Sequence, residues 1–249
     1  MIDLHFHCLP GIDDGPRTWD EAVALCREAA SQGTTTLVAT PHVLRDDWIN
    51  DDPAVRDDML FELNTRLEGL PVVLAGCEYL FSSNVLQLLE RGEWSPLTLL
   101  HRSRYLLIEF RTPVLPPDAE SIFHELSLLD VTPVVAHPER HPVFAADPVR
   151  LERLVALGAV AQLTAGSLLG DFGSSARAAC DRFFGLGLAH LVASDAHSLE
   201  RRPPRLAQAR ERARLEWGEE AAKGLFQTNP EALLRSEPLP WRSEPAEKS

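Results

Sequence analysis

Two histidines and a pair of adjacent aspartates lie close together in the opening stretch MIDLHFHCLPGIDDG. His5 and His7 form an H-x-H pair, and Asp13 and Asp14 follow at the next turn. If the pair lies on a β-strand, both imidazoles lie on one face, because side chains alternate along a strand with a period of two. An H-x-H pair alone is as often incidental as it is a pair of metal ligands, so its meaning depends on the rest of the chain.

Six further histidines and acidic residues end or follow apolar segments: His42, Glu78, Glu109, His137, Asp195 and His197. Each alone has an ordinary explanation as a salt-bridge partner, a turn residue or a helix cap. Together, imidazoles and carboxylates without thiolates suit Mn²⁺, Fe or Zn²⁺, and their number exceeds what one ion binds. We therefore expect two or three divalent ions, which would activate a water and bind phosphoryl oxygens.

Two arginines near these residues could bind a phosphate. Arg140 lies in AHPER and Arg202 in SDAHSLERR, and a guanidinium matches phosphate oxygens bidentately. The alternative for each is a surface salt bridge. The glycine-rich stretch TAGSLLGDFG, with Ser167 at its centre, is a weaker candidate for contact with substrate, because glycines let backbone amides approach a phosphate.

Other routes to hydrolysis have less support. A cysteine phosphatase needs C-x5-R, but the residues six positions after the four cysteines are Asp14, Gln32, Ser83 and Leu186. No G-x-S-x-G motif is present. The cysteines are widely spaced, and we expect them to be buried thiols.

Seven apolar segments are expected to form the strands that position these residues: 1–6, 35–40, 71–76, 105–110, 132–137, 159–164 and 189–194. Continuous apolar runs are typical of parallel strands covered on both faces. Segments with helical periodicity separate them, such as the one opened by the capping box of Thr18 and Glu21. This α/β pattern of seven strands predicts a closed or nearly closed parallel barrel, with a doubly wound sheet as the alternative. The strand ends of a barrel meet at one mouth, where the ligands would converge.

Composition limits the remaining possibilities. The 249 residues are 45% hydrophobic and carry a formal net charge of −13, which argues against binding to nucleic acid or an anionic membrane. With no apolar run of about 18 residues, a cytoplasmic protein is expected. We expect one domain over residues 1–234 and a flexible tail, rich in proline and charge, over residues 235–249.

The motifs MIDLHFHCLPGIDDG, GTTTLVATPH, LIEF, VVAHPER, TAGSLLGDFG and LVASDAH together resemble the bacterial capsule and exopolysaccharide tyrosine phosphatases of the PHP (polymerase and histidinol phosphatase) superfamily. The resemblance runs from Met1 to about residue 234. It implies a distorted seven-stranded, TIM-like (β/α)7 barrel of the PHP fold with three metal ions, most often manganese. It also implies hydrolysis of phosphotyrosine on the tail of a bacterial tyrosine autokinase, with possible peripheral association with that membrane kinase and possible homo-oligomers.

The resemblance also implies which residues act. One ion would take His5, His7, Glu78 and Asp195, a second Glu78, Glu109 and His137, and a third His42, His197 and Asp13 or Asp14. Family spacing favours Asp13, eight residues after His5, but Asp14 stays open. The phosphate-binding arginines correspond to Arg140 and Arg202. The histidine that follows TPH in relatives is replaced by Val43. The alternatives are a small-molecule phosphatase of the same superfamily, such as a histidinol-phosphate phosphatase, and a non-catalytic scaffold that binds a kinase.

Overall fold

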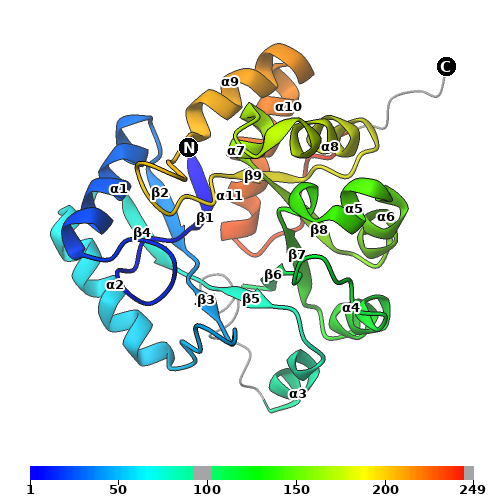
Figure 1. Ribbon diagram of the computed structural model, residues 1–249, viewed down its shortest axis with the longest axis horizontal. Helices are drawn as coiled ribbons and strands as arrows, with labels where there is room; N and C mark the ends of the chain where they lie inside the picture. The colour runs from blue at the N-terminus through cyan, green and yellow to red at the C-terminus, as the bar shows by residue number, and fades with distance from the viewer. Residues whose placement is uncertain (92–102, 244–249) are drawn as a thin grey trace.

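The computed structural model describes residues 1–91 and 103–243, and in it strands occupy the centre with helices around them (Figure 1). The strands are β1 (Ile2–Phe6), β2 (Thr36–Ala39), β3 (His42–Val43), β4 (Val72–Ala75), β5 (Glu78–Leu80), β6 (Tyr105–Glu109), β7 (Thr132–Ala136), β8 (Val160–Thr164) and β9 (Leu191–Ala193). The helices are α1 (Trp19–Ser31), α2 (Pro53–Leu67), α3 (Asn84–Glu90), α4 (Ala119–Leu128), η3 (Pro138–Arg140), α5 (Pro142–Ala146), α6 (Pro148–Ala156), α7 (Ala165–Leu169), α8 (Gly173–Gly185), α9 (Leu206–Trp217), α10 (Glu219–Lys223), η4 (Gly224–Thr228) and α11 (Asn229–Leu234).

All seven predicted strand segments contain a strand, but the expected count of seven is not reproduced, because the described residues form nine. The second predicted segment forms β2, which ends at Ala39. Pro41 lies between β2 and the short strand β3. Proline has no N–H to donate to a strand ladder, which accounts for this interruption. The third segment likewise gives way to β5 after Gly76 and Cys77. These interruptions divide the strands between two sheets.

The two sheets are parallel and follow the order of the chain. One has the order β1-β2-β4 and the other β3-β5-β6-β7-β8-β9. A doubly wound sheet reverses its strand order at a switch point, and neither sheet does so. At the junction of β9 and β1, Phe6 forms an isolated parallel bridge with Ala196, and the Asp195 N–H donates to the His5 carbonyl at 2.9 Å.

Inward-facing residues from both sheets share one apolar cluster. It contains Leu4 of β1, Leu107 of β6, Val160 of β8 and Leu233 of α11, among others. Larger clusters lie between the strands and the surrounding helices. The register between β1 and β2 shifts between Asp3 and Phe6, and Phe6 packs in the cluster with α1 rather than in the inner one. Residues of both sheets and of α11 therefore pack together in one apolar cluster.

Helix α1 illustrates how local sequence sets an element. The Thr18 hydroxyl accepts from the Glu21 N–H at 3.2 Å, which is half of the predicted capping box. The other half differs, because the Glu21 carboxylate accepts from the Arg17 N–H rather than from that of Thr18. Gly33 follows the helix with φ of +88°, a conformation that glycine adopts without strain.

The segment after residue 234, predicted as a flexible tail, packs on the strands as far as Ser243. The Tyr105 hydroxyl donates to the Glu237 carbonyl at 2.6 Å, and the Trp241 N–H donates to Asn229 at 3.0 Å. Residues 244–249 of that predicted tail lie outside the described residues. Among the described ranges, no helix is both long and apolar enough to cross a membrane.

Candidate metal centre

The first group of candidate ligands forms around the H-x-H pair of β1. The Nε2 atoms of His5 and His7 lie 3.1 Å apart. Both face the same two carboxylates: His5 Nε2 lies 3.4 Å from Glu78 Oε2 and 3.2 Å from Asp195 Oδ1, and the corresponding His7 distances are 3.4 Å and 3.6 Å. All four side chains are buried. Three strands thus bring together the four residues expected for the first ion.

The opposite nitrogens of the same imidazoles have their own partners. His5 Nδ1 lies 2.9 Å from Gln162 Oε1, in β8, and His7 Nδ1 lies 2.8 Å from Asp13 Oδ2. Asp13 also accepts from the Gly15 N–H at 2.9 Å, which fixes the turn after β1. A partner on one imidazole nitrogen orients the ring and sets the tautomer in which the other nitrogen would donate its lone pair to a bound metal.

Asp14, rather than Asp13, faces the third group. Its Oδ1 lies 3.4 Å from His42 Nε2 and 3.1 Å from His197 Nε2. One ligand atom from each of His7, Asp14, His42 and His197 lies within 4.8 Å of the others. The geometry therefore favours Asp14 as the candidate ligand, whereas the family spacing favours Asp13. Asp13 instead contacts His7 from the opposite side of the imidazole ring.

The second group is assembled only in part. His137 Nε2 lies 3.0 Å from Glu78 Oε1, as expected. Glu109 instead faces His42, whose Nδ1 is 3.8 Å from Glu109 Oε2, and Arg45, whose guanidinium nitrogen is 2.9 Å from the same oxygen. His42, Glu78 and Glu109 form a compact group of potential ligands. His42 thus lies between two groups, where the sequence assigns it to one.

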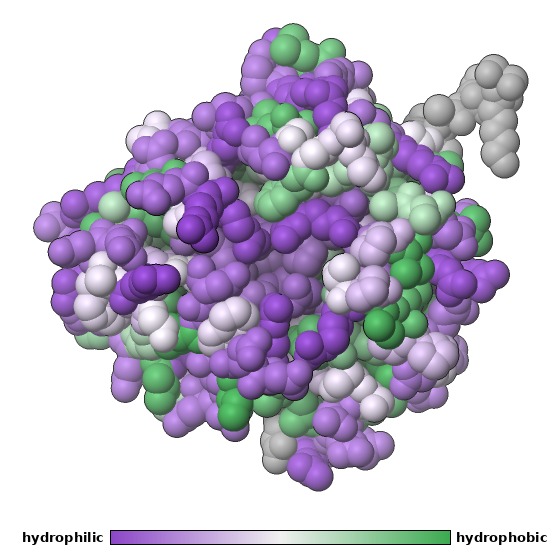
Figure 2. Space-filling view, in the orientation of Figure 1, coloured by the Kyte–Doolittle hydropathy of each residue, from purple (hydrophilic) through white to green (hydrophobic). Residues whose placement is uncertain are grey.

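Both predicted arginines reach the cluster from the same side. Arg140 and Arg202 donate to Oδ2 of Asp195, the carboxylate whose other oxygen faces the histidines. Their side chains are 26% and 22% exposed, so the guanidinium groups lie between the buried ligands and solvent. The Arg140 guanidinium also stacks on the Phe172 ring, 4.3 Å from its centre. Figure 2 shows a hollow with mainly hydrophilic surroundings on this view of the molecule.

Ser167, in contrast, is fully buried and engaged elsewhere. Its hydroxyl lies 2.7 Å from the Thr164 hydroxyl, which donates to Glu139 at 2.6 Å. The same Glu139 oxygen accepts from the Thr164 N–H. This network holds the start of α7 against η3, and it occupies the hydroxyl that the sequence suggests for substrate contact.

The buried oxygens of the cluster fit a bound cation. Glu78 Oε2 and Asp195 Oδ1 have no hydrogen-bond partner among the described residues, although both are buried and surrounded by imidazole nitrogens. Burial alone would lower the pKa of His7, but Asp13 and Glu78 raise it to about 10. Burial would raise the pKa of Asp195, but neighbouring cations, His5 first, hold it well below its usual range. Such a concentration of carboxylate charge favours cations in its midst.

Two of these residues have an unusual backbone conformation. His137 follows β7 with φ of +34°, and Asp195 follows β9 with φ of +54°. Left-handed backbone is uncommon for residues other than glycine and costs about 1–3 kcal/mol. In both cases it turns the chain immediately after a strand, so that the side chain enters the cluster.

Sequence reasoning did not identify several residues of this site. Arg45, Trp48 and Gln162 contact the candidate ligands, and Trp48 stacks on His42 with ring centres 5.2 Å apart. Gln162 lies within an apolar strand, where a polar residue is a usable signal. Arg45 and Trp48 lie in a polar loop whose path the sequence does not specify.

The sequence of the chain matches a known protein family over nearly its whole length. A family model described as "Capsular polysaccharide synthesis, CpsB/CapC" matches residues 1–235. The chain belongs to the CpsB/CapC family. This agrees with the resemblance found in the motifs, and the matched residues include every candidate ligand.

Individual CpsB/CapC relatives match over nearly their full length. The tyrosine-protein phosphatase YwqE of Bacillus subtilis (strain 168) is 38% identical over 242 residues, which cover 96% of this chain and 93% of the relative. The tyrosine-protein phosphatase CpsB of Streptococcus pneumoniae is 29% identical over 241 residues, or 94% and 98% of the two chains.

Solved structures agree with this assignment. A structure described as belonging to YwqE from Bacillus subtilis and CpsB from Streptococcus pneumoniae, "unique metal-dependent tyrosine phosphatases", has a TM-score of 0.91 at 37% identity and covers 98% of each chain. A lactonase from Listeria monocytogenes has a TM-score of 0.57 at 14% identity over 93% of each chain, which shows a likeness of fold alone.

Proposed function

We propose that this CpsB/CapC chain is a metal-dependent protein tyrosine phosphatase that acts in capsular polysaccharide synthesis. One observation carries the proposal: His5, His7, Glu78 and Asp195 converge in a buried cluster, with two arginines bound to its outer carboxylate. The relatives named as tyrosine-protein phosphatases share the family and the length of the chain.

Three divalent ions are proposed for the cluster, with manganese as the metal that the family resemblance implies. The first would be held by His5, His7, Glu78 and Asp195, the second by Glu78, Glu109 and His137, and the third by Asp14, His42 and His197. The short contacts within the first and third groups support this arrangement. When bound, such ions lower the pKa of a bound water and neutralise charge on phosphoryl oxygens.

Residues of the chain itself perform the other parts of the reaction. Arg140 and Arg202 are proposed to bind the phosphate oxygens, because both guanidinium groups are partly exposed beside the buried ligands. Phosphate would replace part of their present contact with Asp195. Asp13 and Gln162 keep the imidazoles of His7 and His5 oriented.

The fold is proposed to act as one distorted seven-stranded barrel of the PHP type. The pairs β2–β3 and β4–β5 each continue one predicted segment, which reduces nine strands to seven runs in chain order. The Phe6–Ala196 bridge supports closure between the first run and the last. A barrel places all strand ends at one mouth, as the candidate site requires.

The substrate is proposed to be phosphotyrosine on a bacterial tyrosine kinase of polysaccharide synthesis, encountered in the cytoplasm. The relatives' names favour a protein substrate over histidinol phosphate, and a nearly complete ligand cluster argues against a non-catalytic scaffold. The family resemblance also implies peripheral association with a membrane kinase and assembly into a homo-oligomer. Binding to nucleic acid is not expected.

Turnover of a phosphotyrosyl peptide by the purified protein tests the function. We expect chelation to abolish turnover and Mn²⁺ to restore it, and we expect His5→Ala/His7→Ala protein to be inactive and to bind less metal. The exposed residue His124 provides a matched control, because His124→Ala removes a surface imidazole of α4 that is not one of the candidate ligands. Undiminished turnover after complete metal removal would contradict the mechanism, and higher efficiency on histidinol phosphate would contradict the substrate.

A further inference from the structure

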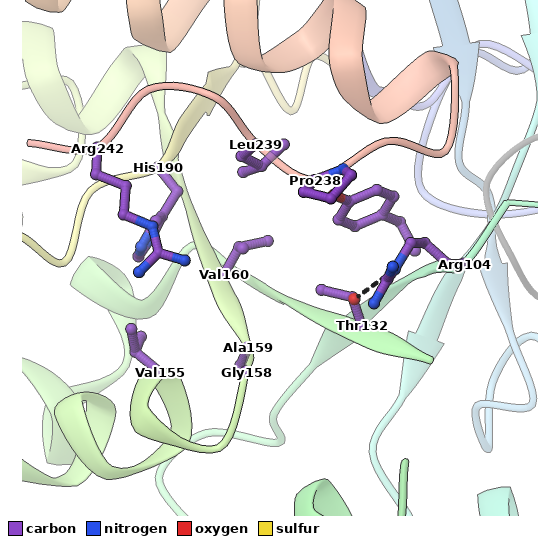
Figure 3. A pocket seen from close by; sticks show the side chains of 11 residues that line it. Arg104, Thr132, Val155, Gly158, Ala159, Val160, His190, Pro238, Leu239 and Arg242 are labelled. Carbon is purple, nitrogen blue, oxygen red and sulfur yellow. Dashed lines mark hydrogen bonds between the residues drawn. The ribbon is translucent and has the colours of Figure 1, made fainter. Parts of the chain in front are cut away.

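A second cavity lies at the opposite ends of the strands. Arg104 precedes β6, Thr132 begins β7, Val160 begins β8 and His190 precedes β9, and all four line a cavity of about 160 Å³ (Figure 3). Glu109 ends β6, His137 follows β7 and Asp195 follows β9, so on these strands the candidate metal ligands lie at the carboxyl ends, whereas the cavity residues lie at the amino ends. All strands of a parallel sheet run in the same direction, so their amino ends and carboxyl ends lie on opposite sides of the molecule. The cavity is therefore separate from the metal centre.

The C-terminal segment forms one wall of this cavity. Pro238, Leu239 and Arg242 line it, and hydrogen bonds hold the segment on both sides of these residues. Before them, the Arg104 N–H donates to the Ser236 hydroxyl at 2.9 Å, and the Tyr105 hydroxyl donates to the Glu237 carbonyl. Between Leu239 and Arg242, the Asn229 side chain donates to the Trp241 carbonyl at 2.9 Å, and after Arg242 the Ser243 hydroxyl donates to the Ala189 carbonyl at 3.3 Å. The wall is therefore anchored in place by specific contacts.

The charge of the cavity is opposite to that of the chain. Its lining includes two arginines and no aspartate or glutamate, in a chain with a net charge of −13. Arg104 donates to the Thr132 hydroxyl at 3.1 Å and pairs with Asp130 at 2.8 Å, but Asp130 is 81% exposed and lies outside the lining. An ion pair with so exposed a carboxylate is weak and leaves Arg104 available to a second anion.

Arg242 and Arg104 lie on different sides of the cavity, and Arg242 extends from the C-terminal segment toward His190 (Figure 3). His190 accepts the Ala161 N–H on its Nδ1 at 3.1 Å. Burial, and to a lesser extent the charge of Arg242, lower the pKa of His190 to about 4, so the ring is neutral near pH 7. The positive charge of the cavity thus comes from the two guanidinium groups.

We propose that this cavity binds a small phosphate-type oxyanion between Arg104 and Arg242. A planar carboxylate presents its oxygens to one guanidinium, whereas a tetrahedral phosphate presents oxygens in several directions and suits two arginines on different walls. The volume is below the roughly 300 Å³ at which pockets for drug-sized ligands begin. Val155, Ala159 and Leu239 add apolar surface beside the charges, which suits a small phosphomonoester as well as free phosphate.

Binding of inorganic phosphate tests the proposal. Calorimetry would use Arg140→Ala/Arg202→Ala protein, so that phosphate binding at the metal centre is weakened, and would compare it with the same protein carrying Arg242→Ala. We expect one phosphate site that Arg242→Ala weakens about tenfold or more. Arg27→Ala, on the exposed face of α1, removes the same charge elsewhere and should leave the site intact. Equal binding with and without Arg242, or no binding in the parent, would overturn the proposal.

Further binding measurements distinguish a phosphomonoester from free phosphate as the ligand and check that the variant is folded. Tighter binding of glycerol phosphate than of inorganic phosphate would assign the site to phosphomonoesters, and the reverse would assign it to free phosphate. Tighter binding of malonate than of both would overturn the phosphate class. Arg242→Lys keeps the charge and should retain part of the affinity, which separates loss of the site from loss of the fold. Phosphotyrosyl-peptide turnover by Arg242→Ala protein should stay unchanged.

Discussion

At the scale of single residues, two adjacent aspartates have different surroundings. Asp13 contacts the outer nitrogen of His7, whereas Asp14 faces His42 and His197. The turn IDDG divides these contacts, because successive side chains point in different directions. One aspartate is thus placed to orient a ligand, and its neighbour is placed to be one.

Substitution of each aspartate should therefore have a different effect on metal content. We expect Asp14→Ala protein to lose about one bound ion per chain, because a direct ligand is removed. Asp13→Asn should keep the full number of ions, but with about 10–100-fold weaker binding, because only the orientation of His7 is affected. Elemental analysis after dialysis against graded chelator measures both effects. Loss of an ion in Asp13→Asn but not in Asp14→Ala would reverse the assignment.

Arg140 should contribute mainly to binding of the phosphoryl group. Arg140→Ala is expected to lower kcat/KM on a phosphotyrosyl peptide by about 10²–10³-fold, because a charged donor at the reacting group is lost. Arg140→Lys should recover only part of this, since lysine lacks the planar fork. Steady-state kinetics measures the change. Arg153→Ala serves as the control, because Arg153 is 61% exposed in a surface ion pair, and it should match the wild type.

At the scale of elements, the strand ends and the turns after them place the ligands. His137 and Asp195 both leave their strands in left-handed backbone, and Pro41 interrupts the strand run just before His42. The C-terminal segment is placed in the same way by close packing. Trp241 lies against Gly224 of η4, where a Cβ atom would overlap its indole ring.

Gly224→Ala should therefore destabilise the protein by displacing the C-terminal segment. We expect a loss of about 1–3 kcal/mol in the free energy of unfolding, typical of overpacking. Gly185→Ala is the matched control, because no atom lies within 4 Å of an added Cβ and its φ is not left-handed. Denaturant unfolding measures both variants. If Gly224→Ala matches Gly185→Ala, the packing of Trp241 does not hold the segment.

At the scale of the whole molecule, a chain with a net charge of −13 has two pairs of arginines at opposite ends of its strands. Arg140 and Arg202 lie at the candidate metal centre, and Arg104 and Arg242 line the cavity. His190 at the amino ends couples this architecture to pH. Its folded-state pKa of about 4 lies below the ordinary value of 6.5, so the unfolded chain binds the proton more tightly. Its contribution to stability is present above pH 6.5 and is lost as the pH falls toward 4.

His190→Gln should reduce the acid sensitivity of folding. Between pH 6.5 and 4, we expect the wild type to lose about 3 kcal/mol more stability than the variant, because only the wild type takes up this proton on unfolding. Urea unfolding of both proteins across this range measures the difference. Exposed His124 again supplies the control, because His124→Gln should leave the pH dependence unchanged. Parallel curves for wild type and His190→Gln would contradict the buried, neutral state.

The sequence by itself determined the repeated strand and helix units, and it placed the candidate ligands at strand ends with the two arginines near them. These follow from local periodicity and from the common direction of parallel strands. It could not determine which of Asp13 and Asp14 faces the cluster, that Ser167 is buried against Thr164, or that Arg45 reaches Glu109.

Only the tertiary structure decided these points, because each depends on contacts between segments far apart in the chain. The C-terminal segment shows the same limit most clearly. Its proline and charge predict a flexible tail, yet Trp241 and Leu239 pack where η4 and the strand ends leave space for them. Composition records how much a segment has to bury, but the surface that receives it is formed only by the folded chain.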